Sequence, residues 1–467
     1  MIDTTDRLVA HVAGADYSQL GQHDIEKAKV FLLDTLGVGI AGSSGAAVSE
    51  LLRTVRSWGE GDEATVWVTG ERLPVQAAAI VNAYQIHCLE YDCVHEGAVV
   101  HPMATVLSAL MAYVERRSSE GRPVNGTDFL LAIALGVDVA AFMGVAATGP
   151  VRFFRPATAG GFGATAAIAR LEGLDHEGMK DALGAMYGQT CGTLQPHVEG
   201  SPLLGLQIGF NARGALAALD LTRAGFRGPH DIIDGRYGYL PMFEAGQFDL
   251  DRVWPSLGSE WQVARLSHKP FPSGRLTHGV VDALQRVTSQ LGIEADDIAS
   301  IQGHVPPLVH RLVGRPDMPD PETNYAKLCL RYVAGAWMAR GQVDVSEFRG
   351  REVLGDPEIH AHAAKVEVFL DDNPDENALD PQRFVFRLTN GQEHEIRLSR
   401  VFGHPDAALT TEQNRAKFDR CITYGARPLG GSRGEEIART VEDIESLEDV
   451  AELASMTVAA PDRSTAM

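Results

Sequence analysis

The stretch TDFLLAIALGVDVAAFM, residues 127–143, decides the fold class. It is apolar nearly all round, and a helix with that pattern is buried inside a larger protein. Two further helices are predicted where good helix formers cluster, at residues 76–89 (QAAAIVNAYQIHCL) and 103–116. Another is expected to be capped by Asp24 and to end near Gly37. Helices that enclose a fully apolar helix form a bundle, so the sequence predicts a mainly α protein.

A second pattern follows the helical segments. Residues 299–305 fit a strand, and residues 364–370 (AKVEVFL) alternate between apolar and polar side chains. Two more candidate strands, 383–388 and 393–398, flank the dipeptide Asn390-Gly391. Because Asn-Gly favours the tight turns that join antiparallel strands, these two are predicted to form a hairpin.

The helical pattern returns at residues 410–421 and 435–455. We therefore predict a large all-helical domain made from both the N-terminal and the C-terminal segments, residues 1–264 and 406–467. A smaller α+β lid domain, residues 265–405, is expected to be inserted between them.

Composition restricts the partners. The 467 residues include 41 basic and 62 acidic side chains, for a formal net charge of -21. Such a charge repels polyanions, so we expect no nucleic-acid partner and no membrane surface. The five cysteines contain no CxxC pair, the first residues do not resemble a secretory signal, and no window approaches 18 uncharged apolar residues. We expect a cytoplasmic protein that must gather specific cations to bind any anion.

Four basic or imidazole side chains lie beside proline: His101, Arg155, His197 and Lys269. Proline is favoured in the first turn of a helix, where unpaired backbone N–H groups attract anions. The four residues are therefore candidates for binding a carboxylate. The alternative is that each X-Pro pair only marks a turn.

The run EYDCVHEGAVVH, residues 90–101, is a dense polar segment after an apolar helix. We interpret Asp92 as a carboxylate that orients or tunes a nearby histidine; a solvated loop is the alternative. The spacing does not match HExxH, and we predict no metal site. The glycines of AGGFG, residues 159–163, do not complete GxGxxG and are attributed to close helix packing, so no nucleotide cofactor is expected.

Several stretches together resemble the MmgE/PrpD family, in order along nearly the whole chain. They are FLLDTLGVGIAG (31–42), ATVWVTGERLPVQAAAIVNAYQIHCLEYD (64–92), the HP at 101–102, RPATAGGFGATAA (155–167), HKPFPSGRLTH (268–278) and NYAKLCLRYVAGA (324–336). The resemblance implies a helical domain built from both chain ends, an α+β lid, and a site in the cleft between them. It also implies a homodimer, and catalysis without a metal or organic cofactor.

The resemblance assigns roles to particular residues. Asp92 matches the acidic loop of the family, His101 its first active-site histidine, Lys269 the lysine of its K-x-(F/Y)-P segment, and Tyr332 a tyrosine near the cleft. These four are the predicted catalytic residues. The predicted substrate-binding residues are Arg155, His197, Gln207, Arg275 and His278.

Three positions depart from the decarboxylase-like members. Arg155 replaces a histidine, Leu204 (or Gln195) stands in the place of a lysine, and Gly274 replaces a second histidine. His197 and His278 are candidates to compensate for these changes.

The reaction expected from the resemblance is proton transfer at a carbon next to a carboxylate of a small di- or tricarboxylate. A histidine base and cations that bind the carboxylates fit that chemistry. We predict a lyase, either a hydro-lyase or a decarboxylase. An isomerase or epimerase that uses the same site is the alternative, and a catalytically silent carboxylate-binding paralogue is a third possibility.

Overall fold

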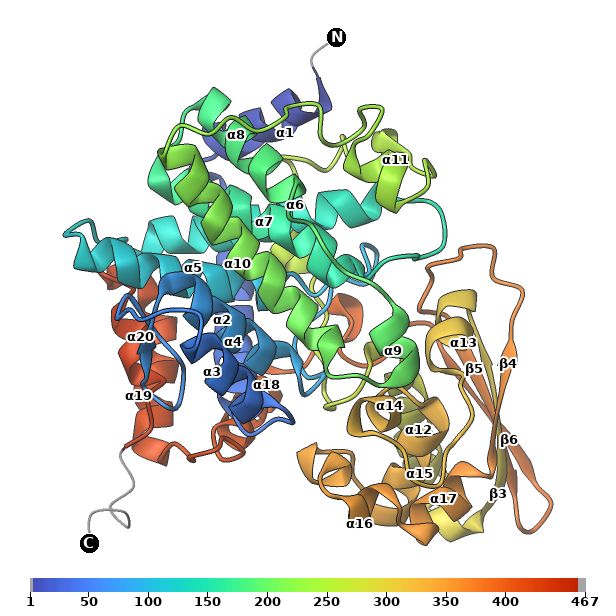
Figure 1. Cartoon of the computed structure of the whole chain (residues 1–467). Helices are drawn as coiled ribbons and strands as arrows, with labels where there is room; N and C mark the ends of the chain where they lie inside the picture. Colours follow the sequence, from blue (N-terminus) through green and yellow to red (C-terminus); the bar gives the residue numbers. More distant parts are fainter. Residues whose placement is uncertain (1–2, 461–467) are drawn as a thin grey trace, which may run out of the picture.

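The computed structural model describes residues 3–460, which form a large helical domain and a smaller domain that contains a sheet (Figure 1). Each domain has its own hydrophobic core. The larger core combines side chains up to Leu266 with side chains from Phe418 onward and also takes in Leu328 and Val345. The smaller core lies between Val280 and Val401. The fold is therefore mainly α, and the described N-terminal and C-terminal segments share one core. The predicted domain limits at residues 264/265 and 405/406 stay predictions.

The helices of the large domain are α1 (Thr4–Gly14), α2 (Gln22–Gly42), α3 (Val48–Arg56), α4 (Val75–His87), α5 (Pro102–Ser119), α6 (Gly126–Val145), α7 (Arg155–Glu172), α8 (His176–Tyr187), α9 (Gln195–Glu199), α10 (Leu203–Arg223), α11 (Tyr239–Phe243), α18 (Thr411–Cys421), α19 (Gly431–Glu442) and α20 (Glu452–Met456). Two short strands, β1 (Ala64–Thr65) and β2 (Arg72–Leu73), pair in the same domain. The predicted helix at 435–455 is in fact the end of α19 followed by α20.

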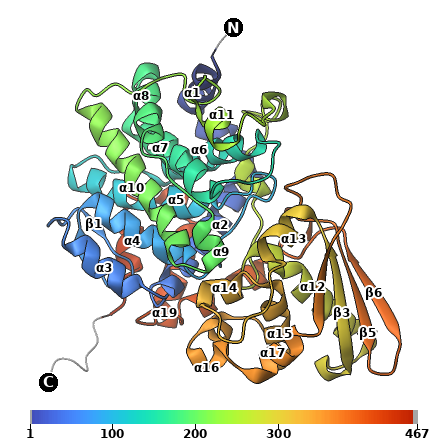
Figure 2. The ribbon, with the colours of Figure 1, turned by 45° about the vertical axis from the view of Figure 1, so that its right-hand side comes forward.

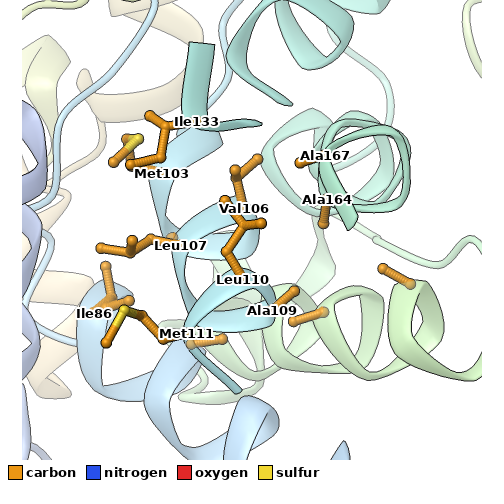
Figure 3. Close-up of a cluster of buried hydrophobic side chains, with 14 of the residues drawn as sticks. Ile86, Met103, Val106, Leu107, Ala109, Leu110, Met111, Ile133, Ala164 and Ala167 are labelled. Atoms are coloured by element: carbon orange, nitrogen blue, oxygen red, sulfur yellow. The ribbon is translucent and has the colours of Figure 1, made fainter. Parts of the chain in front are cut away.

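Helix α6 is buried over nearly its whole length, as the sequence predicted. It is long and apolar enough to cross a membrane by length and composition, contrary to our expectation that no segment would qualify, but 89% of its most apolar window is buried inside the protein. Figure 3 shows how Ile133 of α6 packs with Met103, Val106 and Leu107 of α5, and how Ala164 of α7 approaches the same cluster. Small side chains on α7 let the helices approach closely.

Helix α2 differs from its prediction. Asp24 does not cap the helix from the N-cap position; it lies in the first turn and accepts a hydrogen bond from Gly21 N at 3.0 Å. The helix continues through Gly37 to Gly42. Its glycines do not end the helix; they allow neighbouring elements to pack closely against it. A Cβ added at Gly42 would lie 1.7 Å from the carbonyl oxygen of Gln85 on α4.

The small domain holds α12 (His278–Leu291), α13 (Pro307–Val313), α14 (Thr323–Lys327), α15 (Leu330–Arg340), α16 (Arg351–Leu354) and α17 (Pro357–Ala363). Its sheet has the order β4-β3-β5-β6, with β3 (Ile298–Val305), β4 (Val366–Leu370), β5 (Gln382–Leu388) and β6 (Glu393–Leu398). Strands β3 and β4 are parallel, and the other two pairs are antiparallel. The predicted hairpin at Asn390-Gly391 joins β5 to β6, with Gly391 at φ 87°.

The C-terminal helices α18 and α19 return to the helical domain and pack on α2. Seen from a second side, the two domains meet where α9 of the helical domain lies beside α14 of the small domain (Figure 2). This junction positions the candidate site.

Candidate active site

A cavity lies at the junction of the two domains. Its polar side chains come mainly from the helical domain: His87, Glu90, His101, Arg155 and His197. The small domain contributes a largely apolar wall: Leu276, Leu308, Leu312, Leu328 and Leu379. A cavity with one charged wall and one apolar wall can hold a small anion while limiting its contact with water.

Five side chains at the charged wall form what we call the charge cluster: His87, Glu90, Asp92, His101 and Lys269. Asp92 lies at its centre, with its carboxylate 3.0 Å from His87 Nδ1, 3.3 Å from His101 Nδ1 and 3.7 Å from Lys269 Nζ. Glu90 accepts a hydrogen bond from Lys269 at 2.7 Å and lies 3.2 Å from His87 Nε2. Two carboxylates, one ammonium and two imidazoles are thus packed together.

The backbone holds the cluster in place. His87 is the last residue of α4 and His101 immediately precedes α5, so the loop that joins these helices carries the carboxylates. Glu90 adopts a positive φ of 54°, which is uncommon for a residue with a side chain. Lys417 of α18 donates a hydrogen bond to the carbonyl oxygen of Tyr91 at 2.9 Å. The C-terminal segment therefore braces the loop at its strained point.

The two histidines of the cluster differ in protonation. Burial alone lowers the pKa of His87, but the carboxylates of Asp92 and Glu90 outweigh it and raise that pKa to about 9. Burial and the Lys269 ammonium instead lower the pKa of His101 below its usual value. Glu90 and Asp92 are buried, which by itself would raise the pKa of each carboxyl. The adjacent Lys269 and the histidines outweigh burial and hold both pKa values well below the normal range. Near neutral pH the cluster therefore pairs a charged His87 with a neutral His101.

The hydrogen bonds of His101 define its tautomer. Its Nδ1 lies 3.0 Å from the carbonyl oxygen of Cys93, which can only accept, so Nδ1 carries the proton. In the neutral ring Nε2 is then the basic atom. The His101 side chain is 12% exposed, against 2% for His87 and 0% for Asp92 and Lys269. His101 is therefore the member of this group that best reaches the cavity with a free base.

The two predicted arginine anchors are already occupied. Arg155 lines the cavity at the start of α7, but it donates to both carboxylate oxygens of Glu244 at 2.9 and 2.8 Å and to Ala98 O at 3.1 Å. Arg275 donates to Glu96 at 2.8 Å and to Val401 O at 3.0 Å. We correct the expectation that these guanidinium groups are free to bind substrate, since their charges are neutralised within the protein.

His197 and Arg315 are an alternative group for binding a substrate anion. The sequence analysis had singled out His197 but not Arg315. His197, on α9, lines the cavity, and its Nδ1 accepts a hydrogen bond from Arg315 at 2.7 Å. Its Nε2 therefore carries the proton, and burial and the arginine lower the pKa of His197 to about 4. Within residues 3–460, no carboxylate lies within 4.0 Å of Arg315. This pair supplies an N–H donor backed by an uncompensated cation.

Three predicted site residues lie outside the cavity lining. Gln207 exchanges hydrogen bonds with Thr193 at 2.6 and 3.1 Å and so fixes the loop before α9. His278 is fully buried beside Arg275. Tyr332 lies in the core of the small domain and donates to backbone carbonyls, at 3.1 Å to that of Glu347. These contacts are structural, so the cleft positions expected for the three are corrected.

The positions that depart from the family pattern do face the cavity. Leu204 and Gly274 both line it. A Cβ added at Gly274 would lie 2.7 Å from Leu328 Cδ2, so the apolar wall occupies the space beside this glycine. The cavity thus has apolar surface where a lysine and a histidine were expected by resemblance.

No metal-ligand spacing is evident in the sequence, yet the fold brings a possible donor set together in the charge cluster. His87, Asp92 and His101 offer ligand atoms that all lie within 4.8 Å of one another. Two imidazoles and a carboxylate can bind a divalent transition metal. Here, however, both Nδ1 atoms face the same carboxylate, and Lys269 places a positive charge 3.7 Å from it. These contacts favour a hydrogen-bonded charge cluster.

Comparisons with known proteins agree along the whole chain. The MmgE/PrpD N-terminal domain matches residues 6–251, and the MmgE/PrpD C-terminal domain matches residues 271–443. The cis-aconitate decarboxylase of Mus musculus is 27% identical over 95% of this chain and 91% of its own length. The human cis-aconitate decarboxylase is also 27% identical, over 97% and 94%. A cis-aconitate decarboxylase-like protein of Aspergillus oryzae is 26% identical over 92% of each.

Proposed function

The chain belongs to the MmgE/PrpD family, and from that premise we propose that it is a lyase that removes CO₂ or water from a small di- or tricarboxylate, using its own side chains. Decarboxylation is the first choice, because the similar proteins named above are cis-aconitate decarboxylases or resemble them. The substrate of this chain is a proposal, since 27% identity leaves room for specificity to differ.

The observation that carries the proposal is a pair of imidazoles that share one buried carboxylate, an arrangement that pushes their pKa values in opposite directions. Their ring centroids lie 5.1 Å apart, and each Nδ1 approaches the same Asp92 carboxylate. Neighbouring groups whose pKa values are pushed apart are typical of acid–base catalysis. We assign proton transfer to Nε2 of His101, which is neutral and reaches the cavity. In a hydro-lyase Nε2 would take the proton from carbon; in a decarboxylase it would first take a proton from solvent and then deliver it to the carbon that loses CO₂. Asp92 stabilises the imidazolium that forms when His101 takes a proton.

Charge balance explains the remaining members of the cluster. Protonated His87 and Lys269 offset the two carboxylates, so the wall does not repel an anionic substrate. We propose that the Nε2–H of His197, which lines the cavity, donates to one substrate carboxylate, and that the Arg315 guanidinium, bonded to His197 Nδ1, strengthens this donor from behind. The leucines of the small domain would cover the carbon chain and exclude water. Proton transfer next to a carboxylate needs such a base and such cations.

The test is incubation of the purified protein with cis-aconitate, citrate and 2-methylcitrate separately in heavy water, followed by NMR. A decarboxylase releases CO₂ and incorporates deuterium at the carbon that is protonated. A hydro-lyase interconverts the hydroxylated and unsaturated acids. Folded protein that neither turns over nor exchanges deuterium into any member of a broader di- and tricarboxylate panel would refute the lyase proposal.

An epimerase is the second candidate. The cavity shows apolar surface at Leu204 and Gly274, where decarboxylase-like members are expected to carry a cation and an imidazole. Fewer positive groups fit a substrate with fewer carboxylates. In the same NMR experiment, an epimerase exchanges deuterium into a stereocentre of a dicarboxylate without loss of CO₂ or water, which separates the two candidates.

We further propose that the protein acts as a cytoplasmic homodimer. Support comes from an apolar groove between α3 and α10, where Trp58 is 50% exposed and Leu203 is 43% exposed. Among residues 3–460 the five cysteines are all free, as expected in a reducing compartment. Size-exclusion chromatography with light scattering tests the dimer. A monomeric mass at micromolar protein concentration would contradict the dimer.

A further inference from the structure

We propose a second anion-binding site, separate from the candidate active site, that takes a small polyanion between the two domains. The site is a cavity that shares no lining residue with the first one. The helical domain contributes residues 44–46 and Leu89, and the small domain contributes Pro272, Lys327 and the turn at residues 348–350. A ligand here would touch both domains.

Two chain segments, at residues 89–90 and 327–328, contribute neighbouring residues to the two cavities. Leu89 faces the second cavity, whereas Glu90, the next residue, faces the first. Lys327 faces the second cavity, and Leu328 faces the first. Occupancy of the second cavity would therefore bear directly on the loop that carries the charge cluster.

The charge of the lining is the main argument. Its two ionisable side chains are Lys327 and Arg349, and no aspartate or glutamate lines the cavity. Within the part of the chain that is described, neither cation has a carboxylate within 4.0 Å. In a protein with a formal net charge of -21, two unpaired cations at one cavity are unusual. Such a site attracts an anion against the background field.

Lys327 is the buried half of the site. It is 3% exposed, and its ammonium donates to the carbonyl oxygen of Cys88 at 2.9 Å. An ammonium has three donors, so others remain for a ligand. Burial lowers the pKa of Lys327 to about 8, which reflects the cost of holding this charge without a counter-ion. An anion beside it would offset that cost.

Arg349 is the solvent-exposed cation of the second cavity. Its guanidinium donates to Tyr424 O at 3.1 Å and also contacts Ser44 Oγ, while it lies over the Tyr424 ring at 5.6 Å. These contacts hold the guanidinium in place and leave its charge unneutralised. Ser44 and Thr323 add hydroxyl groups to the lining. Two cations and two hydroxyls on a compact, polar wall suit oxyanions, either a phosphate or a short polycarboxylate.

Direct binding tests the site with two probes used separately, inorganic phosphate and citrate. We would measure dissociation constants by calorimetry for the wild type, Arg349→Ala, Lys327→Met and His197→Gln, the last of which changes the proposed carboxylate-binding residue of the first cavity. Arg439→Ala is the matched control, because it removes one exposed guanidinium from α19, far from the cavity in sequence. Loss of one charge-assisted hydrogen bond corresponds to about tenfold or more in affinity.

The expected result is that Arg349→Ala and Lys327→Met each weaken binding by about tenfold or more, while Arg439→Ala and His197→Gln do not. Binding of phosphate alone or citrate alone would support the site and identify its chemical class. The proposal is overturned if neither probe binds the wild type, or if Arg349→Ala binds as tightly as the wild type. It is also overturned if His197→Gln weakens binding as much, which would place the anion in the first cavity. Because no turnover is needed, failure here is separate from failure of the lyase proposal.

Discussion

Replacement of Asp92 by asparagine tests how the charge cluster sets the pH range of catalysis. We expect activity to need neutral His101 on the acid side and protonated His87 on the alkaline side. The pKa of His101 is lowered and that of His87 is raised to about 9, so kcat/KM should follow a bell that falls at low pH and again near pH 9. Asp92 raises the pKa of both imidazoles. Asp92→Asn should therefore move both limbs to lower pH.

The magnitude follows from the geometry. Asp92 lies 3.0 Å from His87 Nδ1, and unit charges about 3 Å apart interact by about 5 kcal/mol at an effective dielectric constant of about 20. Glu90 remains beside His87 in the variant and retains part of the stabilisation. If only a third of the interaction is lost, the alkaline limb still moves by about one pH unit, since each unit corresponds to about 1.4 kcal/mol.

The assay is the pH dependence of kcat/KM for the substrate identified by NMR. Asp138→Asn is the matched control, because Asp138 is also a buried carboxylate paired with a histidine, His11, at 3.1 Å, and it does not line the active-site cavity. In Asp138→Asn the acid and alkaline limbs of the pH profile of kcat/KM should stay at their wild-type positions. An alkaline limb that stays in place in Asp92→Asn, with the fold intact, would refute the proposed role of the Asp92–His87 pair.

Three further predictions follow. His101→Gln should lower kcat by about a hundredfold or more while thermal unfolding stays near the wild type, because the base is lost; full turnover would reassign the base. Arg155→Ala should lower the free energy of unfolding by about 3–5 kcal/mol in urea titrations, because Glu244 is left buried and unpaired; a loss confined to substrate affinity would restore Arg155 as an anchor. Chelators should leave activity unchanged, and elemental analysis should find no stoichiometric metal; one zinc or iron per chain would show that His87, Asp92 and His101 bind a metal.

Periodic features of the sequence were sufficient to predict most elements of the fold. The fully apolar pattern of α6 and the Asn390-Gly391 turn each have a local cause, and both appear as predicted. Helix α2 was predicted too short, because glycine inside a helix was interpreted as a stop. Its actual role at Gly42 depends on a contact with α4 more than 40 residues away, which local sequence cannot reveal.

The candidate site shows the same limit. His101 and Asp92 could be singled out because they lie in one polar run. His87 was missed, since it ends an apolar helix and only the fold brings it between two carboxylates. Arg155 was predicted to be free because its partner, Glu244, is 89 residues away. A sequence lists cations, but the structure decides which of them are already neutralised.

The proposed mechanism requires a protonated His87 and a neutral His101 in the same cluster near neutral pH. Nitrogen-15 NMR of the imidazole rings at pH 7.5 measures this directly, with assignments from His87→Gln and His101→Gln. We expect both ring nitrogens of His87 to carry protons and His101 to carry one, on Nδ1. A neutral His87, or a His101 with its proton on Nε2, would contradict it.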